Sequence, residues 1–172
     1  MGLAVRTADS IGIPPVVNKA LKKIGLESKY SAVFIIIDQS SWRTLHSLQD
    51  YLFFGYPSIE TLSRLIHHRG HVKFQYIQQH ASQDKGSDSK HMPITDNLII
   101  EKYLANFGVY SIDGLIEALA TASSTASREI INFLAPLKLS APLTSYERNV
   151  LKYKDNSFGF QTDIDKCLIG MA

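Results

Sequence analysis

The stretch "SAVFIIID", residues 31–38, decides the fold class, because its β-branched and aromatic side chains run on without helical spacing. A continuous run of this kind is typical of a β-strand that is covered on at least one face. The segment before it begins with Pro14 and Pro15 and ends with Gly25. Proline at the start and glycine at the end predict a short helix there. We therefore expect a fold in which helices and strands follow one another.

The segments that flank this strand and helix extend the pattern to strand, helix, strand, helix, helix, strand. The further elements that we predict are a strand over 3–8, a helix over 41–55, a helix over 58–69 and a strand over 71–78. Helices on one face of a small sheet would bury the apolar sides of both. The sequence thus predicts an α+β fold, a small split β-α-β (ferredoxin-like) sandwich with a C-terminal helical extension and tail.

The second half of the chain differs in composition from the first. Residues 81–93, "ASQDKGSDSKHMP", are polar and lack aromatic side chains, which indicates a loop or an insertion. Three short amphipathic helical patterns follow before Pro136, and a last helix is predicted over 163–169. We expect residues 1–80 to form the β-α-β core, and residues 94–172 to form a helical extension and tail packed on that core.

Charge is distributed unevenly along the chain. Residues 1–80 carry nine Lys/Arg and five Asp/Glu, whereas residues 81–172 carry nine and eleven. The front half is therefore the candidate anion-binding half. The longest apolar run is strand-length, so we expect no membrane partner, and the single cysteine excludes an intramolecular disulfide. A cytoplasmic location agrees with both features.

The histidine-rich stretch "SRLIHHRGHVKF", residues 63–74, suggests a metal site at first sight. His67 and His68 are neighbours on a predicted helix and therefore point about 100° apart. No Asp, Glu or Cys lies in this stretch, and Arg69 and Lys73 would repel a cation. We predict no metal ligands here.

Two readings of the exposed cationic side chains stay open at this point. Arg64, His67 and His68 share the polar face of their helix, and Lys19, Lys22 and Lys23 share that of the first helix. Each set suits an ordinary solvated face, and each suits an anion-binding surface. Arg6, before the loop that leads to the first helix, and Arg43, at the head of the second helix, favour the second reading. A distributed cationic surface fits phosphate contact and shape recognition of structured RNA.

Signals of catalysis are weak throughout the sequence. The chain has no G-x-S-x-G, no P-loop, no G-x-G-x-x-G and no H-E-x-x-H motif. "SDSK", residues 87–90, matches S-x-x-K but lies in the polar stretch without a partner motif. We predict a protein without enzymatic activity, cofactor or small-molecule substrate.

Four blocks of the sequence resemble one known family, in the order in which they occur. They are "FFGYPSIETLSRLIHHRGHVKF", "ITDNLIIEKYLANFGVYSIDGLIEAL", "INFLAPLKLSAP" and "SFGFQTDIDKCLIGMA". They resemble the large-subunit ribosomal proteins called L-seven in eukaryotes and L-thirty in bacteria, in their eukaryotic and archaeal form. The resemblance runs from about Leu3 to Met171. It implies a β-α-β sandwich bound to large-subunit ribosomal RNA (rRNA).

The resemblance also implies roles for individual positions. It places Arg69, Gly70 and Lys73 at a turn that approaches rRNA in the family, with His67, His68 and His71 beside them. The complete set of predicted RNA-binding residues is Arg6, Lys19, Lys22, Lys23, Arg43, Arg64, His67, His68, Arg69, Gly70, His71 and Lys73.

The function that the resemblance implies is that of a structural constituent of the large ribosomal subunit. Its partners would be rRNA and neighbouring ribosomal proteins, in cytoplasmic ribosomes, with assembly in the nucleolus of a eukaryote. The long polar insertion at 81–93 is also similar to the L-seven-like paralogue that acts in ribosome assembly. A third reading is a protein-interaction module that needs no RNA.

Overall fold

A five-stranded sheet forms the centre of the computed structural model, which describes all residues except 10–11, 74–90, 122–124, 142–157, 169 and 172. The strand order is β6-β2-β1-β3-β7. The strands are β1 (Gly2–Arg6), β2 (Ser31–Ile35), β3 (Leu52–Gly55), β6 (Leu137–Lys138) and β7 (Gly159–Gln161). β1 pairs antiparallel with both β2 and β3, and β7 joins β3 in parallel. The predicted α+β fold class is confirmed.

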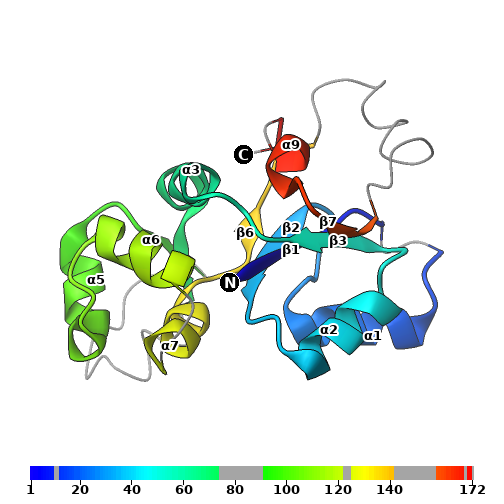
Figure 1. Cartoon of the computed structure of the whole chain (residues 1–172), viewed down its shortest axis with the longest axis horizontal. Helices are drawn as coiled ribbons and strands as arrows, with labels where there is room; N and C mark the ends of the chain where they lie inside the picture. The colour runs from blue at the N-terminus through cyan, green and yellow to red at the C-terminus, as the bar shows by residue number, and fades with distance from the viewer. Residues whose placement is uncertain (10–11, 74–90, 122–124, 142–157, 169, 172) are drawn as a thin grey trace.

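Helices cover both faces of this sheet (Figure 1). The described helices are α1 (Pro15–Ile24), α2 (Gln39–Ser47), α3 (Ile59–Arg69), α5 (Asn97–Leu104), α6 (Ile112–Thr121), α7 (Thr125–Phe133) and α9 (Ile164–Leu168). Of these, α5, α6 and α7 gather beside the sheet, at the left of Figure 1. Ala4 of β1 belongs to a cluster of buried residues that includes residues of α1 and α2, whereas Leu3 and Val5 belong to the larger cluster that includes residues of α3, α5, α6 and α7. Because successive side chains of a strand point to opposite faces, α1 and α2 lie on one side of the sheet and α3 on the other.

The helix ends follow the expected local chemistry. The Ser58 side chain accepts a hydrogen bond from the Thr61 N–H and begins α3. Gly25 adopts a left-handed backbone, with φ of 98°, directly after α1. Gly108 does the same after the 3-10 turn Ala105–Phe107 that extends α5. The helices predicted after Pro14, after Ser58 and between residues 94 and 136 are confirmed.

The helix predicted over 41–55 is wrong in its second half. α2 ends at Ser47, and Leu52–Gly55 form β3, which lies between β1 and β7 in the sheet. Trp42, Leu45 and Leu48 recur at helical spacing, and Leu52 continues that period. Leu52 and Phe53 are nevertheless both fully buried, because a central strand is covered on both faces. Tertiary pairing thus overrides a local pattern that fits either element.

The strand predicted over 71–78 does not join the central sheet. Its described part, β4 (His71–Lys73), pairs antiparallel with β5 (His91–Pro93) in a separate two-stranded sheet. The remainder of that prediction, and residues 81–90 of the predicted polar loop, lie outside the described residues. The outer strands of the central sheet, β6 and β7, come instead from the C-terminal part of the chain.

Candidate nucleic-acid interface

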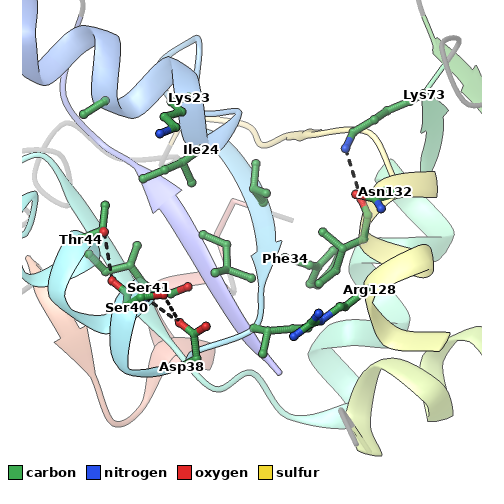
Figure 2. A pocket seen from close by; sticks show the side chains of 16 residues that line it. Lys23, Ile24, Phe34, Asp38, Ser40, Ser41, Thr44, Lys73, Arg128 and Asn132 are labelled. Atoms are coloured by element: carbon green, nitrogen blue, oxygen red, sulfur yellow. Dashed lines mark hydrogen bonds between the residues drawn. The ribbon is translucent and has the colours of Figure 1, made fainter. Parts of the chain in front are cut away.

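A groove of about 840 Å³ opens between the layer of α1 and α2 and the helix α7. β2 contributes Phe34 and its neighbours to the groove, and β4 contributes Lys73. Figure 2 shows Lys23 on the side of α1, with Lys73 and Arg128 on the opposite side. Its charged lining consists of these three cations and Asp38, so positive charge predominates.

The three cations come from three elements and differ in environment. Lys23 of α1 and Arg128 of α7 are exposed, whereas Lys73 of β4 is half-buried. The Lys73 ammonium donates a hydrogen bond to the Ile131 carbonyl at 3.2 Å. Burial lowers the pKa of Lys73 below its ordinary value of 10.5, because removal from water disfavours the charged form.

None of these three cations is neutralised by a carboxylate in the described part of the chain. The ion pairs found there join Lys29 to Asp9 at 2.7 Å and Lys166 to Asp163 at 2.9 Å. A hollow bordered by three cations that lack a carboxylate partner among the described residues favours anions such as phosphates. Serine and threonine hydroxyls of α2 add hydrogen-bonding groups to its lining.

The carboxylate of Asp38 is held by the helix that it begins. It accepts hydrogen bonds from the Ser41 N–H at 2.6 Å and from the Ser40 hydroxyl at 3.0 Å. These bonds lower the pKa of Asp38 to about 2, since they stabilise the ionised form. Asp38 therefore stays charged near neutral pH and acts as the N-cap of α2.

Within the predicted site, the structure brings together only some of the residues. Lys23 and Lys73 border the same groove, and Lys19, Lys22 and Arg43 are exposed on α1 and α2. Arg128 was missed by the sequence prediction. The sequence places it in an amphipathic helix, but nothing local indicates that α7 lies opposite α1.

The α3 ridge, which we define as Arg64, His67 and His68, lies apart from this group. All three side chains are exposed on one helix. Because α3 and α1 cover opposite faces of the sheet, the ridge and the α1 lysines do not form one continuous row. The two sets remain separate candidate surfaces.

The glycine turn after α3 is bonded mainly to the protein itself. The Arg69 guanidinium donates to the Ser140 hydroxyl at 2.6 Å, and His71 Nδ1 donates to the Arg69 carbonyl at 2.9 Å. Gly70 is buried, and a Cβ atom there would lie 2.3 Å from the Ile66 carbonyl oxygen. Only glycine fits this approach, so the turn fixes how α3 leads into β4.

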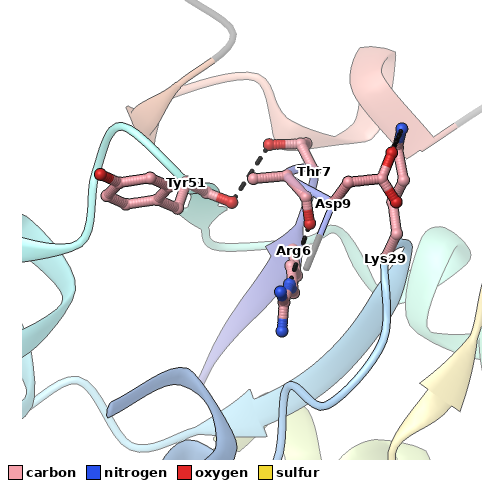
Figure 3. A network of polar contacts seen from close by, with 6 residues as sticks. Arg6, Thr7, Asp9, Lys29 and Tyr51 are labelled. Carbon is pink, nitrogen blue, oxygen red and sulfur yellow. Dashed lines mark hydrogen bonds and ion pairs between the residues drawn. The ribbon is translucent and has the colours of Figure 1, made fainter. Parts of the chain in front are cut away.

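Arg6 requires a correction, because its side chain is fully buried. Its guanidinium donates to the carbonyls of Ala8 at 2.9 Å, Leu26 at 2.9 Å and Glu27 at 3.0 Å. Figure 3 shows it beneath a network that also includes the Lys29–Asp9 ion pair. Burial lowers the pKa of Arg6. Arg6 joins the loops around β1, and we leave it out of the candidate interface.

Groups that could support catalysis or hold a metal ion are scarce in the described residues. No cluster of three or more His, Cys, Asp or Glu side chains suited to a metal ion occurs among them. Cys167 is half-buried against the core, and burial raises the pKa of its thiol. No helix in the described part of the chain is long and apolar enough to cross a membrane.

The fold and the groove define a class, a small α+β sandwich protein with a cationic groove beside its sheet. No family model matches the chain. Several curated proteins are similar to it. Mouse "Large ribosomal subunit protein uL30-like 1" is 29% identical over 140 residues. The proteins named "Large ribosomal subunit protein uL30" of Candida glabrata and Dictyostelium discoideum are 32% identical over 130 residues and 26% identical over 142 residues. The predicted resemblance is confirmed, and the chain belongs to the uL30 family.

The extent of these matches is asymmetric. They cover 81%, 76% and 83% of this chain but 51%, 48% and 52% of the mouse, C. glabrata and D. discoideum proteins. The chain thus spans about half the length of the curated relatives that it matches. These relatives are named as ribosomal proteins and none as an enzyme, which agrees with the prediction of a non-enzymatic protein.

Proposed function

We propose that this chain is a structural constituent of the large ribosomal subunit and binds rRNA phosphates in the groove. The observation that carries the proposal is that Lys23, Lys73 and Arg128 line one hollow and that none of them pairs with a carboxylate among the described residues. The names of the relatives support the assignment to the large subunit.

The environment of Lys73 supports this use of the groove. A half-buried ammonium group that has no counter-charge among the described residues lowers the stability of the folded chain, and the same burial lowers its pKa. A phosphate in the groove would supply the missing negative charge. Lys19, Lys22 and Arg43 extend the cationic surface over α1 and α2, so several phosphates would be contacted. Binding of this kind weakens steeply as salt rises.

The remaining predicted residues take secondary parts in this proposal. The α3 ridge would remain a solvated face without phosphate contacts. Arg69, Gly70 and His71 would act as positioning residues that orient β4 and, through it, Lys73. Neighbouring ribosomal proteins would pack elsewhere on the chain. The site of action would be the cytoplasmic ribosome, with assembly in the nucleolus of a eukaryote.

The proposal is tested by locating the chain in fractionated ribosomes and their precursors. We expect it to be stoichiometric in mature large subunits, and to be depleted from them by the double variant Lys23→Gln and Arg128→Gln. A matched control, Lys102→Gln with Lys166→Gln, removes the same charge from exposed positions outside the groove.

Two results would contradict the proposal. Presence in precursors and absence from mature subunits would identify an assembly factor instead. Association that persists after removal of RNA and does not respond to salt would identify a protein-interaction module.

A further inference from the structure

Three exposed aromatic side chains from three separate elements meet at one edge of the sheet. Trp42 of α2, Tyr56 after β3 and Phe160 of β7 are 36%, 52% and 44% exposed. The ring centroids of Trp42 and Phe160 lie 5.3 Å apart, and those of Tyr56 and Phe160 lie 6.2 Å apart. We refer to these three residues as the aromatic platform.

The platform is fixed from below by the core. Phe54 of β3 is buried, and its ring centroid lies 5.4 Å from that of Trp42 and 5.8 Å from that of Phe160. Phe54 and Phe160 are register partners in paired strands, so their side chains share one face of the sheet. Rings held in this way lose little conformational entropy when a ligand packs on them.

The platform and the cationic groove share the helix α2. Ser40, Ser41 and Thr44 of α2 line the groove, whereas the Trp42 ring packs on Phe160. Arg43, the next residue, is exposed. The carboxylates that follow β7 already have partners, because Asp165 accepts from the Ser58 N–H and Asp163 pairs with Lys166. Aromatic faces and phosphate-binding cations therefore lie on two sides of one short helix.

We propose that the aromatic platform stacks unpaired bases of an RNA whose phosphates lie in the groove. This inference rests on the proposed function and deepens it, because it names the recognised element as single-stranded or bulged RNA. Every base has a π-face, so stacking on such a platform tolerates many sequences. A protein partner would use the aromatic rings as apolar anchors but would not need the adjacent cations.

The single tryptophan of the chain provides a direct test. The full chain is titrated with a single-stranded RNA of about 12 nucleotides and with an abasic ribose-phosphate strand of the same length. Binding is measured by anisotropy of a label on the strand, and stacking by the fluorescence of Trp42. We expect both strands to bind, but only the strand with bases to quench Trp42.

Variants complete the test. Tyr56→Ala and Phe160→Leu should each weaken binding of the base-carrying strand by roughly five- to fiftyfold and leave abasic binding unchanged. Tyr110→Ala is the matched control, because Tyr110 is 60% exposed and lies between the 3-10 turn Ala105–Phe107 and α6, outside the platform. Circular dichroism of each variant verifies that it is folded.

The outcomes separate this inference from the proposed function. Binding of both strands with equal affinity and without quenching would overturn the stacking inference and leave the proposed function standing. Failure of both strands to bind would overturn both. The platform variants could also bind RNA as the wild type does and yet be lost from large subunits. That result would show that the platform docks a protein, and it would overturn the stacking inference.

Discussion

The groove and the α3 ridge both gather basic side chains, but they are built in different ways. The ridge consists of Arg64, His67 and His68, neighbours on one helix whose side chains all reach solvent. The groove consists of Lys23, Lys73 and Arg128, which are 105 residues apart at the extremes and come from three elements. One of them is half-buried, and its pKa is lowered by burial.

This difference shows what distinguishes a binding surface from a solvated face. Exposed cations on a single helix are stable without a ligand, because water and counterions solvate them. Cations that converge on a hollow repel one another, and partial burial weakens their solvation. An anion relieves both effects in the groove and neither on the ridge. We therefore assign the phosphate site to the groove.

The largest expected effect is a loss of stability on substitution of Arg6, a buried cation that belongs to neither the groove nor the α3 ridge. Arg6→Met should lower the free energy of unfolding by about 3 kcal/mol, because three backbone carbonyls lose a charged donor in a buried site. Urea unfolding of the variant measures it. Arg64→Met on the ridge is the control and should change stability by less than about 0.5 kcal/mol. Equal effects of the two substitutions would contradict the distinction.

The next largest effect on stability is expected at Gly70, which joins α3, the helix of the ridge, to β4, the strand that carries Lys73. Gly70→Ala should lower stability by about 2 kcal/mol, since its Cβ would meet the Ile66 carbonyl oxygen at 2.3 Å. Gly12→Ala is a useful comparison, because no atom lies within 4 Å of a Cβ there and only its backbone φ of 84° opposes the change. If Gly70→Ala unfolded at the same temperature as the wild type, the close approach of residue 70 to the Ile66 carbonyl oxygen would not matter for stability, contrary to this prediction.

A smaller effect concerns the half-buried lysine. Because the folded-state pKa of Lys73 is lowered, the unfolded chain holds this proton more tightly and stability rises with pH. The rise should occupy the window between the lowered pKa and 10.5, the ordinary value. The unfolding free energy of the wild type, relative to Lys73→Met, should increase through this window. A difference that falls as pH rises would contradict the burial of an unpaired ammonium.

The smallest expected effect comes from the carboxylate in the groove. Asp38→Asn should strengthen RNA binding by roughly twofold, because it removes a negative charge that repels phosphates. Asparagine keeps an acceptor oxygen for the Ser41 N–H, so α2 retains its N-cap. Weaker RNA binding by this variant, measured by filter retention, would place the phosphates elsewhere.

Much of the fold was predictable, because local signals determine it. Proline, serine and glycine at helix ends determine the bounds of α1 and α3 within a residue or two. The prediction failed at Leu52–Gly55, where helical spacing continues into a segment that becomes a central strand. Spacing describes one face of an element, and it cannot show that a strand will be buried on both faces.

The candidate site was predictable only in part, for a related reason. Lys23 and Lys73 were found as individual cations, but their convergence depends on how β4 and α1 pack. Arg6 was assigned to the candidate interface because of its charge, and two of its three carbonyl acceptors, Leu26 and Glu27, lie 20 and 21 residues further along the chain. Arg128 was missed because its partners across the groove lie more than 50 residues away along the chain. Only the tertiary structure determines that Lys23, Lys73 and Arg128 line one groove and that Arg6 is buried away from it.

The most direct test of the groove assignment is the salt dependence of binding to large-subunit rRNA. The groove variant Lys23→Gln with Arg128→Gln is compared with the ridge variant Arg64→Gln, His67→Gln and His68→Gln. We expect the slope of log affinity against log salt concentration to become shallower by about 1.4 to 1.8 in the groove variant, since two phosphate contacts are lost. The ridge variant should keep the wild-type slope. A ridge variant with the shallower slope, beside a groove variant that matches the wild type, would contradict the assignment of phosphate binding to the groove.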